Sequence, residues 1–184
     1  MLTRNVRTAV DVLETGGIIA YPTEGVWGLG CDPFDERAVN RLLQLKQRPV
    51  EKGLILVAAS MEQIAALLAP LDEQQMALLR SGWPGPNTWL LPDPDQLVPA
   101  WIKGKFDTVA VRVSDHPLVQ ALCKGFGGPI VSTSANPGSK PPATSSVRVL
   151  TWFGDKIDFV VPGRLGGAKG PSSIRDLCSS QRIR

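Results

Sequence analysis

The chain has 184 residues, of which 43% are hydrophobic and 20% charged, and its mean hydropathy is +0.01. This composition excludes an intrinsically disordered protein, and the length fits one domain that buries a core of its own. The formal net charge of +3 permits an anionic ligand or a nucleic acid as partner but requires neither.

The N-terminus and the cysteines indicate the compartment. Residues 1–17 contain Asp11 and Glu14 and no uninterrupted apolar core, so we expect no signal peptide, and no apolar run approaches the ~18 residues of a membrane span. The widely spaced Cys31, Cys123 and Cys178 favour neither a disulfide framework nor a metal motif. We therefore expect a cytoplasmic protein without a membrane partner.

Hydrophobic spacing predicts helices and strands that alternate along the chain. Two helix starts carry a capping-box arrangement, Ser60 with Gln63 and Asp72 with Gln75. The alternation predicts an α/β fold: one domain, residues 1–184, with an open twisted mixed sheet and flanking helices. The predicted helices are 3–14, 35–47, 118–124, 146–153 and those that begin at Ser60 and Asp72; the predicted strands are 18–21, 54–59, 88–91, 108–113, 130–132, 157–161 and 173–177.

Two glycine-rich stretches lack the known nucleotide motifs. Residues 25–30 read G-x-x-G-x-G, which is the wrong order for a dinucleotide fingerprint, and residues 163–170 have Ala168 and Gly170 where a P-loop needs glycine and Ser or Thr. Spacing alone favours turn-forming glycines in both. The only histidine, His116, precedes Pro117, so a helix-capping role is at least as good an interpretation as a catalytic one.

Four segments could carry chemistry, and each has an alternative interpretation. Residues 21–30 leave a strand through a hydroxyl and glycines, which suits a ligand loop or a turn. Cations at positions 46, 48 and 52 end a helix, where they could bind an anion or remain in water. Arg112 interrupts an apolar strand and needs a carboxylate from the protein or from a substrate. Residues 130–136 run from a strand into small polar groups that could bind phosphate or ribose, or form a plain turn.

Taken in order, these segments resemble one family. The blocks YPTEGVWGLGCDP, LKQRPVEKGLIL, WPGPNTWLLP, VAVRVSDHPL, STSAN and PSSIRDL resemble the YrdC/TsaC family, the threonylcarbamoyl-AMP synthases of tRNA modification, over essentially the whole chain. The resemblance implies an enzyme that joins L-threonine, bicarbonate or CO2 and ATP into threonylcarbamoyl-adenylate and releases diphosphate. Partner proteins then pass the group to the adenosine beside the anticodon of tRNA. The implied fold is an open twisted sheet around a positively charged central cavity.

Matching the motifs residue by residue implies the roles in the site. The catalytic residues would be Lys46, Arg48, Ser134 and Asn136. Those binding ATP would be Lys46, Arg48, Thr108, Ser134, Asn136 and Arg184, and those binding L-threonine would be Thr23, Lys52, Arg112, Ser132 and Ser173. Mg²⁺ would ride on the phosphates without ligands from the protein, and no tightly bound organic cofactor is expected.

The chain departs from the family pattern at a few places. Gly25 stands where Thr or Ala is usual, Trp27 where Tyr or Phe is common, and residues 137–139 match only loosely. The sequence shows no counterpart of the extra C-terminal domain of longer members, so we expect a single domain.

Two other functions compete with the synthase. One is a non-catalytic factor that binds tRNA or double-stranded RNA or assists ribosome maturation, although basic clusters are few outside the candidate site. The other is the YrdC-like module of hydrogenase-maturation proteins, whose acylphosphatase and zinc-finger elements are missing here. RNA binding remains possible as a secondary property of a synthase.

Overall fold

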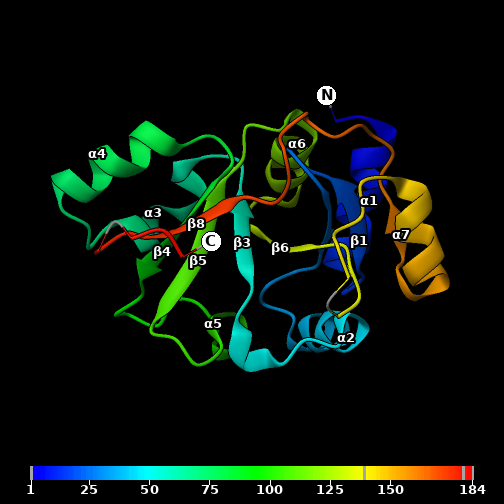
Figure 1. Ribbon diagram of the computed structural model, residues 1–184, viewed down its shortest axis with the longest axis horizontal. Helices are drawn as coiled ribbons and strands as arrows, with labels where there is room; N and C mark the ends of the chain where they lie inside the picture. The colour runs from blue at the N-terminus through cyan, green and yellow to red at the C-terminus, as the bar shows by residue number, and fades with distance from the viewer. Residues whose placement is uncertain (1, 139, 180, 184) are drawn as a thin grey trace.

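An eight-stranded mixed sheet forms the centre of the computed structural model, which describes residues 2–138, 140–179 and 181–183 (Figure 1). The strand order is β7-β1-β2-β6-β3-β5-β4-β8. The pairs β1–β7, β3–β5 and β4–β8 are parallel and the other neighbours are antiparallel. The strands are β1 (Ile19–Pro22), β2 (Trp27–Gly30), β3 (Ile55–Ala58), β4 (Asn87–Pro92), β5 (Thr108–Val113), β6 (Ile130–Ser134), β7 (Phe159–Val160) and β8 (Ser173–Asp176).

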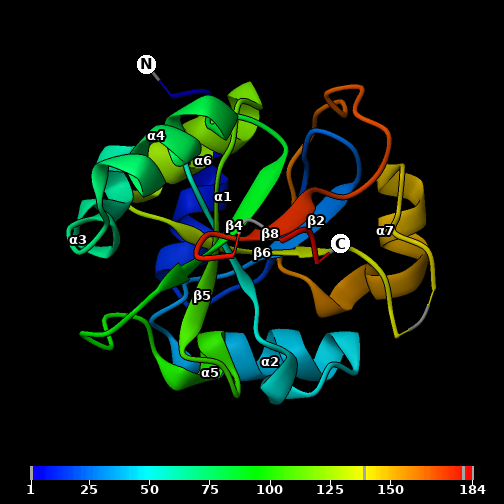
Figure 2. The same cartoon turned by 60° about the vertical axis from the view of Figure 1, so that its left-hand side comes forward.

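Helices cover both faces of this sheet. Helix α1 packs against α6 and α2 against α5, and the two pairs lie on opposite sides of the central strands (Figure 2). The α-helices are α1 (Arg4–Glu14), α2 (Glu36–Lys46), α3 (Ala65–Leu68), α4 (Glu73–Gly82), α5 (Ala100–Lys103), α6 (Pro117–Phe126) and α7 (Ser146–Phe153). Short 3-10 helices are η1 (Val50–Lys52), η2 (Met61–Ile64) and η3 (Gly154–Lys156). None of the helices in the described ranges is both long enough and apolar enough to cross a bilayer.

Strand β3 shows how the sheet divides the core. Leu56 and Ala58 point into the hydrophobic cluster that includes α2, whereas Val57 and Ala59 point into the cluster that includes α1 and α6. A strand that is buried on both faces reads as a continuous apolar run, which is the pattern of residues 54–59. The expected α/β fold with a mixed sheet and flanking helices is confirmed.

Strand β2 corrects the interpretation of residues 25–30 as a turn. Trp27–Gly30 pairs with β1 and β6 as a strand of the sheet, and close packing around Gly30 leaves no room for a side chain there. A Cβ on Gly30 would overlap the carbonyl oxygen of Val131 and come within 2.9 Å of the ring of Tyr21. Gly30 therefore lets β2 pass close to the Val131 carbonyl and to a fully buried tyrosine.

The two predicted capping boxes have different outcomes. Asp72 and Gln75 form a complete capping box at the start of α4. The prediction for Ser60 is wrong, because its side chain caps nothing and the segment begins as the 3-10 helix η2. Gln63 instead accepts from the Ala59 N–H at 2.8 Å and donates to the Cys123 carbonyl at 2.8 Å, so it joins β3 to α6.

Candidate functional site

A cavity of about 280 Å³ lies on the central strands. Its floor consists of alternate residues of three neighbouring strands, which point to the same face. Ile55 of β3 has Ala110 of β5 on one side in the register and Ser132 of β6 on the other. Thr108 and Arg112 continue the row along β5.

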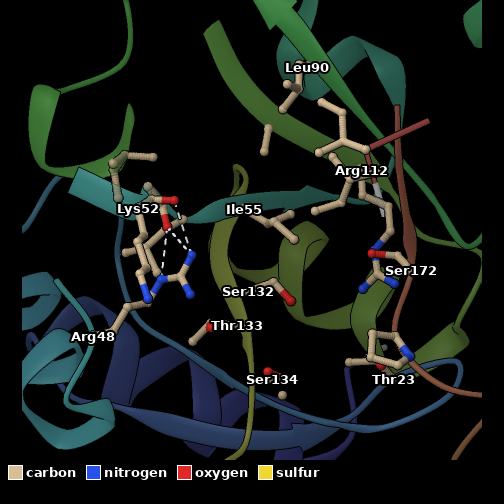
Figure 3. Close-up of a pocket in the computed structure, with 18 of the residues that line it drawn as sticks. Thr23, Arg48, Lys52, Ile55, Leu90, Arg112, Ser132, Thr133, Ser134 and Ser172 are labelled. Carbon is tan, nitrogen blue, oxygen red and sulfur yellow. Dashed lines mark hydrogen bonds between the residues drawn. The ribbon is translucent and has the colours of Figure 1, made fainter. Parts of the chain in front are cut away.

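The polar side chains of the cavity gather at two ends. Figure 3 shows Arg48 and Lys52 at one end and Arg112 at the other, near Thr23 and Ser172. Ser132, Thr133 and Ser134 of β6 lie between the two ends (Figure 3). A row of hydroxyls therefore joins two cationic regions.

The Arg48 end is shaped by the abrupt stop of α2. Gln47 ends the helix in the left-handed region, with φ of 51°, and the chain then turns through Pro49 into η1. The Arg48 guanidinium donates to the carbonyl of Gly53 from Nε at 3.1 Å and from Nη2 at 2.8 Å (Figure 3). These bonds brace the turn that carries Lys52.

Lys46 is buried beneath the polar end of β6. Its side chain, with 5% exposure, donates to the carbonyl oxygens of Ser134 and of Asn136, the latter at 3.0 Å. Burial, and secondarily the charge of Arg48, lowers the pKa of Lys46 to about 8. The alternative of a solvated helix-end cation therefore does not hold for Lys46.

Ser134 and Asn136 form one cluster with this lysine. The Ser134 hydroxyl donates to the Asn136 side-chain oxygen at 2.6 Å, and the Asn136 amide donates to the Gly138 carbonyl at 3.1 Å. Ser134 faces the cavity, while Lys46 and Asn136 are outside its lining and support it from behind.

Arg112 has a carboxylate partner inside the protein. Its Nη1 lies 3.0 Å from Oε2 of Glu24, and both side chains are more than nine-tenths buried. The other oxygen of Glu24 accepts from the Ser114 hydroxyl at 2.6 Å. Burial by itself raises the pKa of the Glu24 carboxyl, but the Arg112 charge and the Ser114 hydrogen bond outweigh burial and hold the pKa below its usual value.

A glycine-rich strap, residues 163–170, covers the loop that carries Thr23 and Glu24. The Gly166 N–H donates to the Thr23 carbonyl at 3.1 Å, and the Ala168 N–H donates to the Glu24 carbonyl at 2.8 Å. A Cβ on Gly25 would overlap the carbonyl of Gly170. The unusual glycine at position 25 is thus explained by this close approach.

Most of the predicted site residues line the cavity. Those that do are Thr23, Arg48, Lys52, Thr108, Arg112, Ser132 and Ser134. Lys46, Asn136 and Ser173 lie outside the lining, and Arg184 lies outside the described residues.

Ser172 and Glu24 are the residues that sequence reasoning missed. The Ser173 hydroxyl donates to Asn87 at 2.8 Å, whereas Ser172, one residue earlier, reaches the cavity. Strand alternation was the available signal, because Ser172 shares a face with Ile174, which also lines the cavity. Glu24 carried no signal beyond its place beside Thr23.

His116 occupies the N-cap position of α6, but its side chain does not cap the helix. Its Nε2 lies 3.0 Å from the carbonyl oxygen of Arg164 in the strap, and its backbone N–H donates to the Ser114 hydroxyl at 3.1 Å. His116 therefore connects the start of α6 with the strap.

Metal ligands are scarce among the described residues. They contain no cluster of three or more His, Cys, Asp or Glu side chains that could hold an ion, and no Asp or Glu in their part of the cavity lining. Cys31 and Cys123 are buried, Cys178 is exposed, and all three are free thiols. The cavity is thus equipped with cations and hydroxyls, which suit anionic oxygen ligands.

Comparison with known proteins points to one family. The Sua5/YciO/YrdC family model, described as telomere recombination, matches residues 11–184, a range that includes all the residues named above as lining the cavity. A protein from Marinobacter nauticus named threonylcarbamoyl-AMP synthase is 56% identical over 176 residues, or 96% of this chain and 93% of that protein. A protein of the same name from Cellvibrio japonicus is 52% identical over 183 residues, or 100% and 96%.

A solved structure agrees with these relatives. The crystal structure of P. abyssi Sua5 complexed with L-threonine is 37% identical, with a TM-score of 0.87 over 94% of this chain. The match spans 51% of the Sua5 chain, so the present chain corresponds to about half of that protein.

Proposed function

The chain belongs to the Sua5/YciO/YrdC family and is a threonylcarbamoyl-AMP synthase, and we propose that its reaction takes place in the cavity between Arg48 and Arg112. The observation that carries the proposal is the division of this cavity into two cationic ends joined by hydroxyls. Threonine brings a carboxylate and ATP brings phosphates, and each of these anionic groups needs a cation. The enzyme must hold the two together with bicarbonate or CO2.

The Arg48 end suits the triphosphate of ATP. Arg48 and Lys52 come from one short turn and both line the cavity. Charge-assisted hydrogen bonds to phosphate oxygens would stabilise the charge that develops on the departing diphosphate. The resemblance assigned Lys52 to threonine, and we assign it to phosphate because it lies beside Arg48.

The Arg112 end suits the carboxylate of threonine. Guanidinium groups bind carboxylates in a fork that lysine cannot reproduce. Thr23 and Ser172 add hydroxyls near Arg112 (Figure 3). Ser132, in the middle of the row, lies where the two substrates would meet.

The chemistry then needs positioning more than a strong base. The threonine nitrogen attacks the carbon of CO2 and loses a proton, which gives a carbamate. A carbamate oxygen attacks the α-phosphorus of ATP, and the bond to the β-phosphate oxygen breaks to release diphosphate. Holding reactants at the right distance supplies much of the rate in such transfers.

Lys46 and Asn136 would act from behind the lining. Both bond to the segment that ends in Ser134, so they set where that hydroxyl and its backbone lie. Thr108 lies on the β5 side of the floor and would contact the nucleotide.

Mg²⁺ would enter with ATP, bound by phosphate oxygens and water. The hydroxyls of the lining could complete its coordination, in keeping with a described lining that has no carboxylate. The ion would neutralise phosphate charge. We propose no tightly bound organic cofactor.

The product leads to tRNA. We propose that partner proteins transfer the threonylcarbamoyl group to the adenosine beside the anticodon, and that this takes place in the cytoplasm. Direct contact of this chain with tRNA or double-stranded RNA is a separate prediction, which a binding measurement at several salt concentrations tests.

The decisive experiment follows diphosphate release. The purified protein with ATP, Mg²⁺ and bicarbonate should release diphosphate only when threonine is added. Arg48→Ala should lower this rate at least about a hundredfold, since removal of one such donor costs ~3–4 kcal/mol. Arg37→Ala, an exposed arginine on α2, is the matched control and should leave the rate unchanged. Release without threonine, or an Arg48→Ala rate above about half of wild type, would contradict the proposal.

A further inference from the structure

We propose that Glu24 is a positioning residue that also sorts the substrates: its carboxylate orients Arg112 and cancels its charge, so that this end of the cavity takes the amino acid and rejects polyphosphate. The inference rests on the proposed function, in which Arg112 binds the threonine carboxylate.

The geometry fixes Glu24 from two sides. Oε2 faces Nη1 of Arg112 at 3.0 Å and Oε1 accepts from the Ser114 hydroxyl at 2.6 Å. The Ser114 hydroxyl in turn accepts from the His116 backbone N–H at 3.1 Å. The Ser114 hydrogen bond therefore holds the carboxylate, while Oε2, which has no hydrogen-bond partner among the described residues, meets Nη1 as an ion pair and keeps its charge next to the guanidinium.

Arg112 keeps donors to offer. Glu24 contacts Nη1, and Nη2 is left as the donor for a ligand, because Nε is shielded from solvent although it has no hydrogen-bond partner among the described residues. Arg112 still lines the cavity, and Figure 3 shows its nitrogens directed toward the space beside Thr23 and Ser172. A guanidinium that is tied at one nitrogen can still receive a second carboxylate.

The charge of Glu24 decides which anion is received. A buried arginine without a counter-charge attracts phosphates more strongly than carboxylates, because Coulomb energy grows with the charge of the ligand. With Glu24 beside it, the pair has no net charge: the repulsion between Glu24 and an anion also grows with the charge of the anion, so it offsets most of the extra attraction that Arg112 alone would exert on a polyphosphate. Threonine also carries an ammonium group, which Glu24 attracts. The pair thus favours a zwitterion.

A purely structural ion pair makes a different prediction. If Glu24 only joins β5 to the loop 23–26, removing its charge lowers stability without changing which ligands compete. Competition between threonine and a polyphosphate therefore distinguishes the two roles.

The test is threonine binding by calorimetry, with and without inorganic pyrophosphate. In the wild type, pyrophosphate should change the Kd of threonine by less than about threefold, since it occupies the Arg48 end. In Glu24→Gln, pyrophosphate should bind at Arg112 and raise the Kd for threonine at least about tenfold, a difference of ~1.4 kcal/mol. Glu24→Asp keeps the charge, so in this variant pyrophosphate should again change the Kd for threonine by little. Glu14→Gln removes an exposed carboxylate from the end of α1 and should behave as wild type.

Three results would overturn the proposal: competition in the wild type, no competition in folded Glu24→Gln, or no rescue by Glu24→Asp. If Glu24→Gln does not fold, Glu24→Ala decides, because it removes the same charge and should give the same competition. Independent binding in folded Glu24→Ala would then refute the role of Glu24. Arg112→Lys without pyrophosphate tests the underlying assignment. If it binds threonine as tightly as wild type, the proposed function of Arg112 fails; if it loses threonine while Glu24→Gln shows no competition, only the sorting role fails.

Discussion

Replacing Lys46 with methionine keeps the length of the side chain and removes its ammonium group. Two carbonyl oxygens, on Ser134 and Asn136, then lose a donor, at a cost of ~1–3 kcal/mol each. Against this, the pKa of Lys46 is lowered from 10.5 to about 8, and at ~1.4 kcal/mol per pKa unit the buried charge costs about 3 kcal/mol. The two effects largely offset. We expect the free energy of unfolding of Lys46→Met to change by no more than about 3 kcal/mol and its Tm by no more than about 12 °C.

Lys46→Ala should differ, although both variants lose the charge. Alanine also removes a buried apolar stem, and truncations of that size in a core cost ~2–5 kcal/mol. The alternative of a cation that ends the helix and remains in water leads to the expectation of no cavity in this variant. The burial of Lys46 makes that expectation wrong. Lys46→Ala should therefore melt clearly below Lys46→Met.

Activity should fall in both variants. Without the ammonium group the Ser134–Asn136 segment is free to shift, and a misplacement of ~1 Å can cost about a hundredfold in rate. We expect threonine-dependent diphosphate release to slow at least about tenfold at saturating substrates. Arg37→Met, on the exposed side of α2, controls for loss of a cation. Equal melting of Lys46→Met and Lys46→Ala would refute the packing argument, and a rate within twofold of wild type would refute the link to the segment.

Three further outcomes are expected. Arg112→Lys should weaken threonine binding by ~1.5–3 kcal/mol in calorimetry, about 10- to 150-fold, and leave ATP binding unchanged; equal threonine affinity would contradict this. Gly30→Ala should lower stability by ~1–3 kcal/mol, because its Cβ would overlap the Val131 carbonyl. A Cβ on Gly128 would have no other atom within 4 Å, so Gly128→Ala should change stability by less than about 1 kcal/mol, and thermal melts compare the two variants. NMR of the Lys46 amine should show titration near pH 8, because burial and then Arg48 lower its pKa. Between pH 8 and about 10.5 the Lys46 amine is protonated in the unfolded chain but mostly neutral in the folded protein. The contribution of Lys46 to stability should therefore rise with pH across that interval, and titration of the folded protein near 10.5 would contradict this.

The strands and helices with regular hydrophobic spacing could be predicted from the sequence. Strand β3 showed its apolar run, and α4 showed its capping box. Strand β2 could not be recognised, because Gly30 is required mainly by the carbonyl of Val131, which lies on a strand far along the chain. Spacing within a segment contains no information about a neighbour that is distant in the sequence.

The candidate site shows the same division. The polar segments of the cavity were visible as strand ends rich in hydroxyls and cations. Neighbouring residues of a strand point to opposite faces, so the sequence alone did not tell whether Ser172 or Ser173 reaches the cavity. The prediction named Ser173, but Ser172 is the one that faces inward. The partner of Arg112 was left open because Glu24 and Arg112 are distant in the chain and meet only through the fold.

The layout of the cavity has a consequence for the order in which the protein is made. Its walls take residues from both ends of the chain, from Thr23 beside β1 to Ile174 in β8. A ribosome that has released only the first half of the protein holds a chain with an incomplete site. Until β8 emerges and pairs with β4, the backbone N–H and C=O groups of that side of β4 have no partner in the sheet, and an open strand edge of this kind favours association between chains. Substrate binding therefore cannot assist the early part of folding, and nascent chains should depend on chaperones most strongly just before the last strand is added.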